Sequence, residues 1–231
     1  MMKLSWQQIA DPTITEILCN NSLEGIVLDT EHGCFNTETL FRCIQVATLY
    51  KKKCFVRLIS PNKKMIRLCL DAGCDGLIFA MIEDLDQVVE VKKHCNYPRY
   101  GGKRGLGLVR QNKWGLKSDL ISFPPILVAQ IETVTGISNL NLIKDKCVFD
   151  YFMIGPYDLT ASLGIPGEFN NKKYIEQLNR AISIAGKEKM AVHIPSNIKK
   201  EMKKYENYGI IALGMDTTFL IEKYQEVEKY A

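Results

Sequence analysis

Two carboxylates that follow apolar runs in the second half of the chain could hold a divalent metal ion. Glu132 ends the run ILVAQIE, and Asp158 follows the run YFMIG within the segment GPYD. If these runs are neighbouring strands, the two side chains converge, and carboxylates that share a site repel each other so that one keeps its proton. A hard cation such as Mg²⁺ or Mn²⁺ would relieve that repulsion. The alternative is that Glu132 pairs with a lysine and Asp158 caps the turn at residues 159–162.

Acidic and basic side chains also follow two apolar runs near the N-terminus. The segment VLDTEHGCFN contains Asp29, Glu31 and His32. His32 could carry a proton near neutral pH, with Asp29 or Asp71 to orient it, or it could simply be satisfied by a backbone carbonyl. Arg57 in FVRLIS must face an anion, which could be a structural ion-pair partner, a substrate carboxylate or an enolate oxygen. Strand alternation would point Glu31 away from its neighbours.

These side chains need elements that bring them to one place. Eight apolar runs predict strands, and between them lie amphipathic stretches that predict helices. The runs are apolar on both faces, as in a parallel sheet covered by helices. The predicted strands are residues 3–6, 25–29, 54–58, 76–81, 126–132, 151–155, 190–194 and 209–215. The predicted helices are residues 12–20, 36–50, 61–72, 83–94, 134–144, 172–187, 196–206 and 216–229.

Eight such units predict one domain, residues 1–231, folded as an α/β (β/α)8 TIM barrel. A doubly wound open sheet is the rival, but no Gly-rich phosphate fingerprint follows the first strand. In a barrel, catalytic side chains lie at the carboxyl ends of the strands. The long loop at residues 96–123 is a further candidate for a functional segment.

The bulk composition argues against several classes of protein. The net charge is +4, and the lysines form no concentrated patch with aromatic residues, so we expect no nucleic-acid partner. We expect no membrane association, because no apolar run approaches the ~20 residues of a membrane-spanning helix. The N-terminus lacks an apolar secretory segment, which predicts a cytoplasmic protein. The eight cysteines show no CxxC pair, and those inside apolar runs, such as Cys54 and Cys69, are expected to be small buried apolar groups.

Several motifs resemble the HpcH/HpaI family of class II, metal-dependent pyruvate aldolases, which lie in the phosphoenolpyruvate/pyruvate superfamily. They occur in the family's order over about residues 4–220, and QIET and GPYDLTASLG are the most specific. The other matching motifs are DTEHG, FVRL, LDAGCDGLIFAMI, YGGKRGLG and ALGMDTTFL. The resemblance implies a phosphoenolpyruvate/pyruvate-type barrel in a homo-oligomer, a trimer or hexamer, with the last helix exchanged between subunits.

The resemblance also implies roles for individual residues. Glu132 and Asp158 match the family's metal ligands, for Mg²⁺ or Mn²⁺ with Co²⁺ or Zn²⁺ as alternatives. Arg57 matches a residue that contacts the ketoacid and its enolate, and His32 matches one that transfers protons. The remaining matches are supporting acids at Asp29 and Asp71, a residue near the ketoacid at Gln130, and a carboxylate-binding segment at Gly155, Pro156, Tyr157 and Asp158.

The expected activity is a carbon–carbon lyase that makes or cleaves a 4-hydroxy-2-keto acid of the 2-keto-3-deoxy sugar acid type. Pyruvate and an aldehyde would be its partners, and the reaction would pass through a pyruvate enolate. Two alternatives stay open, a citryl- or malyl-CoA-type lyase of the same superfamily and a non-catalytic ketoacid-binding barrel. Tyr157 departs from the alanine of many members, and it would narrow the pocket if its ring points inward.

Overall fold

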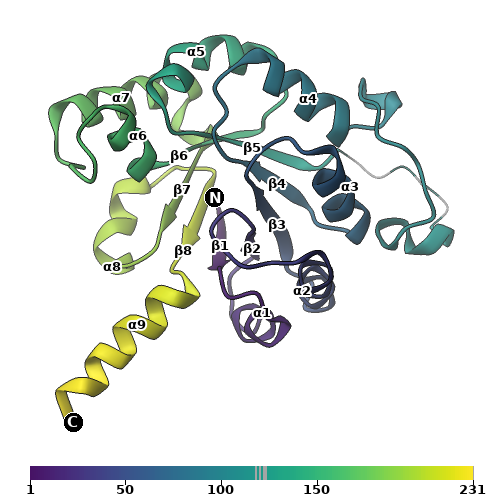
Figure 1. The fold of residues 1–231 in the computed structure, drawn as a ribbon, viewed down its shortest axis with the longest axis horizontal. Coiled ribbons are helices and arrows are strands. Elements are labelled where there is room, and N and C mark those ends of the chain that lie inside the picture. The colour runs from purple at the N-terminus through teal and green to yellow at the C-terminus, as the bar shows by residue number, and fades with distance from the viewer. Residues whose placement is uncertain (118, 120, 122–123, 231) are drawn as a thin grey trace.

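The computed structural model describes residues 1–117, 119, 121 and 124–230. It shows a closed barrel of parallel strands in sequence order, β1 to β8, which confirms the predicted fold class (Figure 1). The strands are β1 (Met2–Gln7), β2 (Gly25–Asp29), β3 (Lys53–Leu58), β4 (Gly76–Phe79), β5 (Ile126–Ile131), β6 (Tyr151–Ile154), β7 (Met190–Ile194) and β8 (Ile210–Leu213).

Helices follow the strands, and most of them surround the barrel. They are α1 (Pro12–Cys19), α2 (Thr37–Leu49), α3 (Lys63–Ala72), α4 (Leu85–Cys95), α5 (Val134–Asp145), α6 (Pro156–Ser162), α7 (Lys172–Ala185), α8 (Ile198–Glu201) and α9 (Asp216–Val227). Side chains cap the N-termini of several helices: Asn36 and Asn62 accept backbone N–H groups at the starts of α2 and α3. Two differences from expectation stand out. The predicted helix at 196–206 is only the short α8 followed by a 3-10 turn, and α6 is an additional helix directly after β6.

Two layers of apolar side chains hold the fold together. One layer lies between the barrel and its helices, and it contains most of the buried residues. The other fills the barrel interior and consists of Leu4, Trp6, Val27, Phe55, Ile78, Val128, Met153, Ala191, Ile210 and Ala212. Both faces of each strand are therefore buried, which explains why the strands are nearly continuous apolar runs.

The interior layer determines which residues face the mouth of the barrel. Every second residue of a strand turns toward the interior. Since Val27 is an interior residue, Asp29 points inward at the carboxyl end of β2. The same alternation in β3, β5 and β7 brings in the side chains of Arg57, Gln130 and His193.

Helix α9 projects away from the barrel instead of packing along it (Figure 1). Its exposed large apolar side chains are Phe219, Leu220, Ile221, Tyr224 and Val227. In the described part of the chain, no helix has the length and apolar character needed to cross a bilayer.

Candidate active site at the carboxyl ends of the strands

An ion pair between Arg57 and Asp29 anchors the site. The two residues are partners in the register of β3 and β2. Arg57 donates from Nε to Asp29 Oδ1 over 2.8 Å and from Nη2 to Asp29 Oδ2 over 2.5 Å. Trp6 Nε1 and Gln8 Nε2 also donate to Asp29 Oδ2, over 3.2 and 3.3 Å. Burial alone would raise the pKa of Asp29, but the hydrogen bonds and charge of Arg57 outweigh burial and lower that pKa. Asp29 is therefore an ionised partner that fixes the guanidinium.

The Asp29 carboxylate contacts the backbone of the turn that carries His32. Its Oδ1 accepts the backbone N–H groups of Glu31 and His32 over 3.1 and 3.3 Å. The side chain of His32 is exposed to solvent. Asp29 thus shapes the turn that carries His32, and among the described residues no hydrogen bond joins its carboxylate to the imidazole ring.

Glu31 belongs to the site, which corrects the expectation that it points away. Strand β2 ends at Asp29 and residues 30–32 form a turn, so strand alternation does not extend to Glu31. Glu31 Oε2 lies 2.9 Å from Arg57 Nη1 and the side chain is 15% exposed. This contact is an ion pair without hydrogen-bond geometry, because Oε2 has no hydrogen-bond partner in the described part of the chain. Burial raises the pKa of Glu31, and Asp158 adds to that effect while Arg57 opposes it.

Glu132 follows β5 directly, and both of its carboxylate oxygens accept hydrogen bonds. Oε1 accepts the backbone N–H of Met81 over 2.7 Å, and Oε2 accepts from Gln130 Nε2 over 2.6 Å. Its partners are thus two neutral groups, not the lysine of the alternative interpretation. Burial raises the pKa of Glu132 to about 7, and the negative charges of Glu31 and Asp158 contribute to the rise. Glu132 is consequently a buried acid close to two other acids.

Gly155 leaves room for the Glu132 carboxylate. A Cβ atom on Gly155 would lie 2.0 Å from Glu132 Oε2, far inside van der Waals contact. Asp158 follows in the first turn of α6, and its side chain is exposed. The N-cap residue of α6 is Gly155, with no side-chain cap, so the alternative of a capping Asp158 is wrong.

The oxygen atoms around Glu132 fit a hard divalent cation. Each Glu132 oxygen uses one lone pair in its hydrogen bond and keeps another. Gln130 Oε1 is buried without a hydrogen-bond partner among the described residues, so it is a free acceptor beside this carboxylate. In the described ranges, no three His, Cys, Asp or Glu side chains gather as a metal-binding group. An ion held by Glu132 and Asp158 would therefore take its other ligands from water and substrate.

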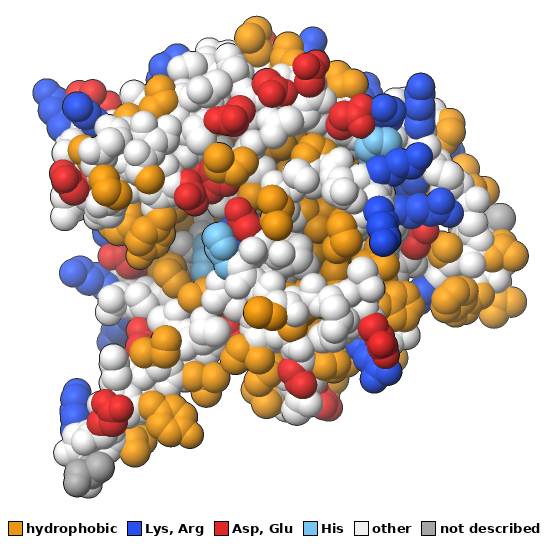
Figure 2. Space-filling view, viewed as in Figure 1, with side chains coloured by type: hydrophobic (Ala, Val, Ile, Leu, Met, Phe, Trp, Pro, Cys, Tyr) orange, Lys and Arg blue, Asp and Glu red, His pale blue; other side chains and the backbone are white. Residues whose placement is uncertain are grey.

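His193 is a further residue at the mouth, and it supports the Arg57 guanidinium indirectly. Its ring stacks on Trp6 with centroids 4.1 Å apart and an interplanar angle of 9°, and the Arg57 guanidinium lies 5.0 Å from the Trp6 ring centre. Burial lowers the pKa of His193 to about 4, so the ring is neutral at physiological pH. Acidic and histidine side chains gather near the hollowed middle of the face in Figure 2.

Asp71 lies elsewhere. It is near the end of α3, which leads into the amino end of β4, whereas the site residues follow the carboxyl ends of strands. Its carboxylate pairs with Arg104 Nη2 over 2.8 Å and with Arg67 Nε over 3.3 Å. In a single copy of the chain, α3 thus carries Asp71 to the opposite end of the barrel, and the structure does not bring it to His32.

Tyr157 packs on the outer side of the site. Its ring meets Phe169 edge to face with centroids 5.0 Å apart, and the residue is 66% exposed. Phe169 lies between α6 and α7, and it packs in turn against Tyr174 of α7. This arrangement turns the Tyr157 ring toward the α6–α7 segment. Pro156 occupies the first position of α6, where its missing N–H leaves no helical bond unmade.

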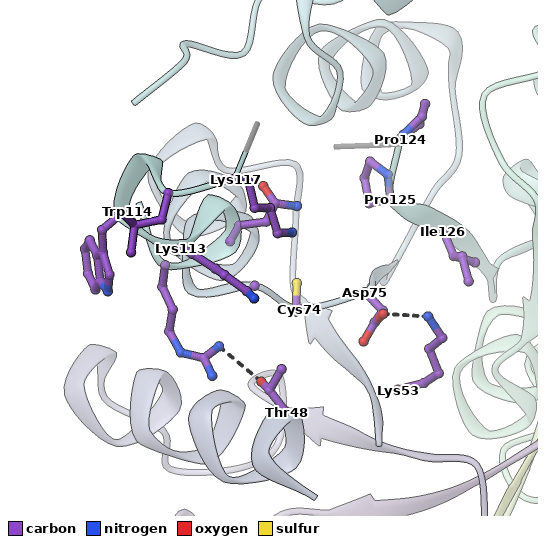
Figure 3. Close-up of a pocket in the computed structure, with 14 residues that line it drawn as sticks. Thr48, Lys53, Cys74, Asp75, Lys113, Trp114, Lys117, Pro124, Pro125 and Ile126 are labelled. Atoms are coloured by element: carbon purple, nitrogen blue, oxygen red, sulfur yellow. Dashed lines mark hydrogen bonds and ion pairs between the residues drawn. The ribbon is translucent and has the colours of Figure 1, made fainter. Parts of the chain in front are cut away.

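A cavity of about 660 Å³ lies at the other end of the barrel (Figure 3). It is bounded by the amino ends of β3, β4 and β5 and by residues 110–117. Lys53 and Asp75, whose ion pair spans 2.7 Å, form part of its wall. Since the residues at the carboxyl ends of the strands do not line it, this cavity is separate from the candidate active site.

The chain is similar to known proteins in sequence. The profile of the family described as HpcH/HpaI aldolase/citrate lyase matches residues 3–223. A 2-keto-3-deoxy-L-rhamnonate aldolase from Shigella dysenteriae is 28% identical over 220 residues, which are 92% of this chain and 82% of that protein.

Solved structures share the fold. An HpcH/HpaI aldolase/citrate lyase family protein from Burkholderia cenocepacia matches with a TM-score of 0.89 and 19% identity, over 99% of this chain and 93% of that one. A citrate lyase beta subunit from M. tuberculosis, complexed with oxaloacetate and magnesium, has a TM-score of 0.62 and 11% identity, over 92% and 90% of the two chains.

Proposed function

Because the chain belongs to the HpcH/HpaI aldolase/citrate lyase family, we propose that it is a carbon–carbon lyase that makes or cleaves a 4-hydroxy-2-keto acid. The observation that carries this proposal is that two carboxylates, Glu132 and Asp158, lie at one barrel mouth with the anchored Arg57 guanidinium. Glu31 lies near both Arg57 and Asp158, since the charges of both residues affect the pKa of Glu31.

Glu132 and Asp158 would hold a divalent metal ion, Mg²⁺ or Mn²⁺ in the first instance, with Co²⁺ or Zn²⁺ as alternatives. When bound, such an ion would polarise the keto group of pyruvate and so acidify its methyl group. The carboxylates must be ionised to bind it. Since the pKa of Glu132 is about 7 without metal, metal binding releases a proton over the neutral range.

Arg57 would bind the substrate carboxylate or the enolate oxygen. Its hydrogen bonds with Asp29 use Nε and one hydrogen of Nη2, and Nη1 lies against Glu31 without a hydrogen bond, so both terminal nitrogens keep N–H groups for substrate. These free N–H groups are held in place before substrate arrives, and donors fixed in advance stabilise developing negative charge well. Gln130, whose Oε1 has no hydrogen-bond partner among the described residues, would lie beside the ketoacid.

His32 would transfer the proton. Its exposed ring sits on the turn that Asp29 fixes, so it can remove a proton from the pyruvate methyl group in the condensation. In the cleavage direction the same group would take the proton of the 4-hydroxyl. The backbone N–H groups of Tyr157 and Asp158, which open α6 after Pro156, would receive the substrate carboxylate.

The substrates would be pyruvate and a small aldehyde, in the cytoplasm. The name of the Shigella relative supports a product of the 2-keto-3-deoxy sugar acid type. We also propose a homo-oligomer, a trimer or hexamer, in which α9 is exchanged between subunits. Its exposed apolar side chains support that arrangement. Light scattering should give the mass of three or six chains, and a monomeric mass would contradict it.

The central test is exchange of the C3 protons of pyruvate in deuterium oxide, followed by proton NMR with Mg²⁺ or Mn²⁺ and again with EDTA. Exchange that requires metal supports enolate formation. An absence of exchange with every metal would contradict a pyruvate enolate and favour the ketoacid-binding barrel. A screen of aldehydes with pyruvate, read by product mass, then identifies the acceptor. Activity on citryl- or malyl-CoA together with none on 4-hydroxy-2-keto acids would favour the CoA-type lyase.

A further inference from the structure

The residue that donates to Glu132 has an unusual backbone conformation. Met81 follows β4 by two positions and has a φ of 54°, in the left-handed region that side chains other than glycine rarely adopt. Its N–H is the 2.7 Å donor to Glu132 Oε1. Strained residues persist only where surrounding contacts hold them, and they occur often at functional sites. Contacts with neighbouring residues must therefore keep Met81 in this conformation.

The side chain of Gln87, in the first turn of α4, makes three hydrogen bonds to the backbone of the segment at residues 81–84. Its Nε2 donates to the Met81 carbonyl over 2.8 Å. Its Oε1 accepts the backbone N–H groups of Glu83 and Asp84 over 2.7 and 3.2 Å. Asp84 completes a capping box by accepting the backbone N–H of Gln87 over 2.8 Å. A cap needs only the oxygen of Gln87, so the contact of its nitrogen with Met81 is an addition to ordinary capping.

The other side of the segment is tied to the elements that carry the metal site. The backbone N–H of Ile82 donates to the Gln130 carbonyl over 3.1 Å. Asn139 Nδ2 of α5 donates to the Glu83 carbonyl over 2.8 Å, and Thr133 Oγ1 donates to Glu83 Oε1 over 2.5 Å. The segment is thus bound to β5 and α5 as well as to α4, and it has few ways to relax.

We propose that Gln87 is a positioning residue for the metal site: its amide nitrogen holds Met81 in the left-handed conformation, so that the Met81 N–H fixes the Glu132 carboxylate. Gln87 itself touches neither metal nor substrate. The proposal rests on the proposed function in one respect, the assignment of Glu132 as a metal ligand.

Two substitutions at this position separate capping from positioning. Gln87→Glu keeps an oxygen for the cap and adds an acid to the first turn of α4, which favours the helix, but it loses the donor to Met81. Gln87→Ala loses both functions. If the Met81 contact matters, both variants should bind Mn²⁺ about tenfold more weakly than the unsubstituted protein, about the effect of one lost hydrogen bond. Free Mn²⁺ can be measured by electron paramagnetic resonance at fixed pH.

A cap variant on another helix is the matched control. Asn171→Ala removes the N-cap of α7, whose side chain accepts the Lys173 N–H over 3.0 Å, and it should leave Mn²⁺ affinity unchanged. A glycine at position 81 should reduce the effect of Gln87→Glu, because glycine adopts positive φ without strain. An equal effect of Gln87→Glu in the Met81→Gly background would contradict the proposal.

Hydrogen exchange of the Met81 amide in metal-free protein tests the same idea without metal. We expect faster exchange in Gln87→Glu, with no change in Asn171→Ala. Unchanged exchange at Met81, or unchanged Mn²⁺ affinity in Gln87→Glu, would overturn the proposal. If the unsubstituted protein binds no Mn²⁺ at all, the proposed metal site fails, and the exchange rate of Met81 still decides whether Gln87 holds this segment.

Discussion

Replacing Glu132 by glutamine should make the metal-free barrel more stable above neutral pH. Burial raises the pKa of Glu132 from 4.5 to about 7. Between these values the folded protein keeps a proton that the unfolded chain has lost. Stability therefore falls as pH rises through this window, and the loss is complete above pH 7. A shift of this size corresponds to about 3 kcal/mol at pH 8 and about 1 kcal/mol or less at pH 5.

The neighbouring groups can accept a glutamine at position 132. The carbonyl oxygen of the new amide can take the Met81 N–H that Glu132 Oε1 accepts now. Its NH₂ group would face Gln130, whose amide nitrogen donates to Glu132 Oε2. A rotation of the Gln130 amide would present its free Oε1 as an acceptor and restore the pair. The substitution then removes the buried charge without leaving a donor unsatisfied.

The assay is urea unfolding, followed by circular dichroism, of EDTA-treated protein at pH 5 and pH 8. We expect Glu132→Gln to gain about 2 kcal/mol more at pH 8 than at pH 5. Glu176→Gln is the control, because this acid on α7 is 60% exposed and should change stability equally little at both pH values. Mn²⁺ should stabilise the unsubstituted protein at pH 8 and not the variant. An equal effect at both pH values, or a loss at pH 8, would refute the reasoning.

Three other substitutions test the remaining parts of the site. Arg57→Lys keeps the charge but loses the paired contact with Asp29, so turnover should fall more than tenfold while circular dichroism stays native. Gly155→Ala would place a Cβ atom 2.0 Å from Glu132 Oε2, and Mn²⁺ affinity should fall at least about tenfold. Asp29→Asn should lower the melting temperature at pH 7, and the difference should shrink as pH falls below 3.8, because the lowered pKa of Asp29 stabilises the fold only while it is ionised.

The barrel and its inward-facing residues could be predicted because they depend on local patterns. Each strand is an apolar run of a few residues, and the alternation along β3 and β5 carries through to Arg57 and Gln130. A side chain at the next inward position of a parallel strand must enter the mouth of the barrel. The sequence is therefore sufficient to place these residues and Asp29 at the same end of the fold.

Residues beyond the strand ends could not be placed in this way. Glu31 sits in a turn, where no periodicity applies, and only the folded chain brings it to Arg57. Asp71 shares a motif with strand residues, but its helix runs back along the barrel and takes it to Arg104.

The sequence by itself therefore determined the barrel, through the number and apolar character of its strands, and the placement of Asp29, Arg57 and Gln130 at one rim. Tertiary structure alone decided how Glu132 is held, through the left-handed Met81 and the Gln87 amide behind it. The physical reason is distance along the chain. The contact of Glu132 with Met81 joins residues 51 positions apart, and it depends on strand register and loop conformation, which no local pattern specifies.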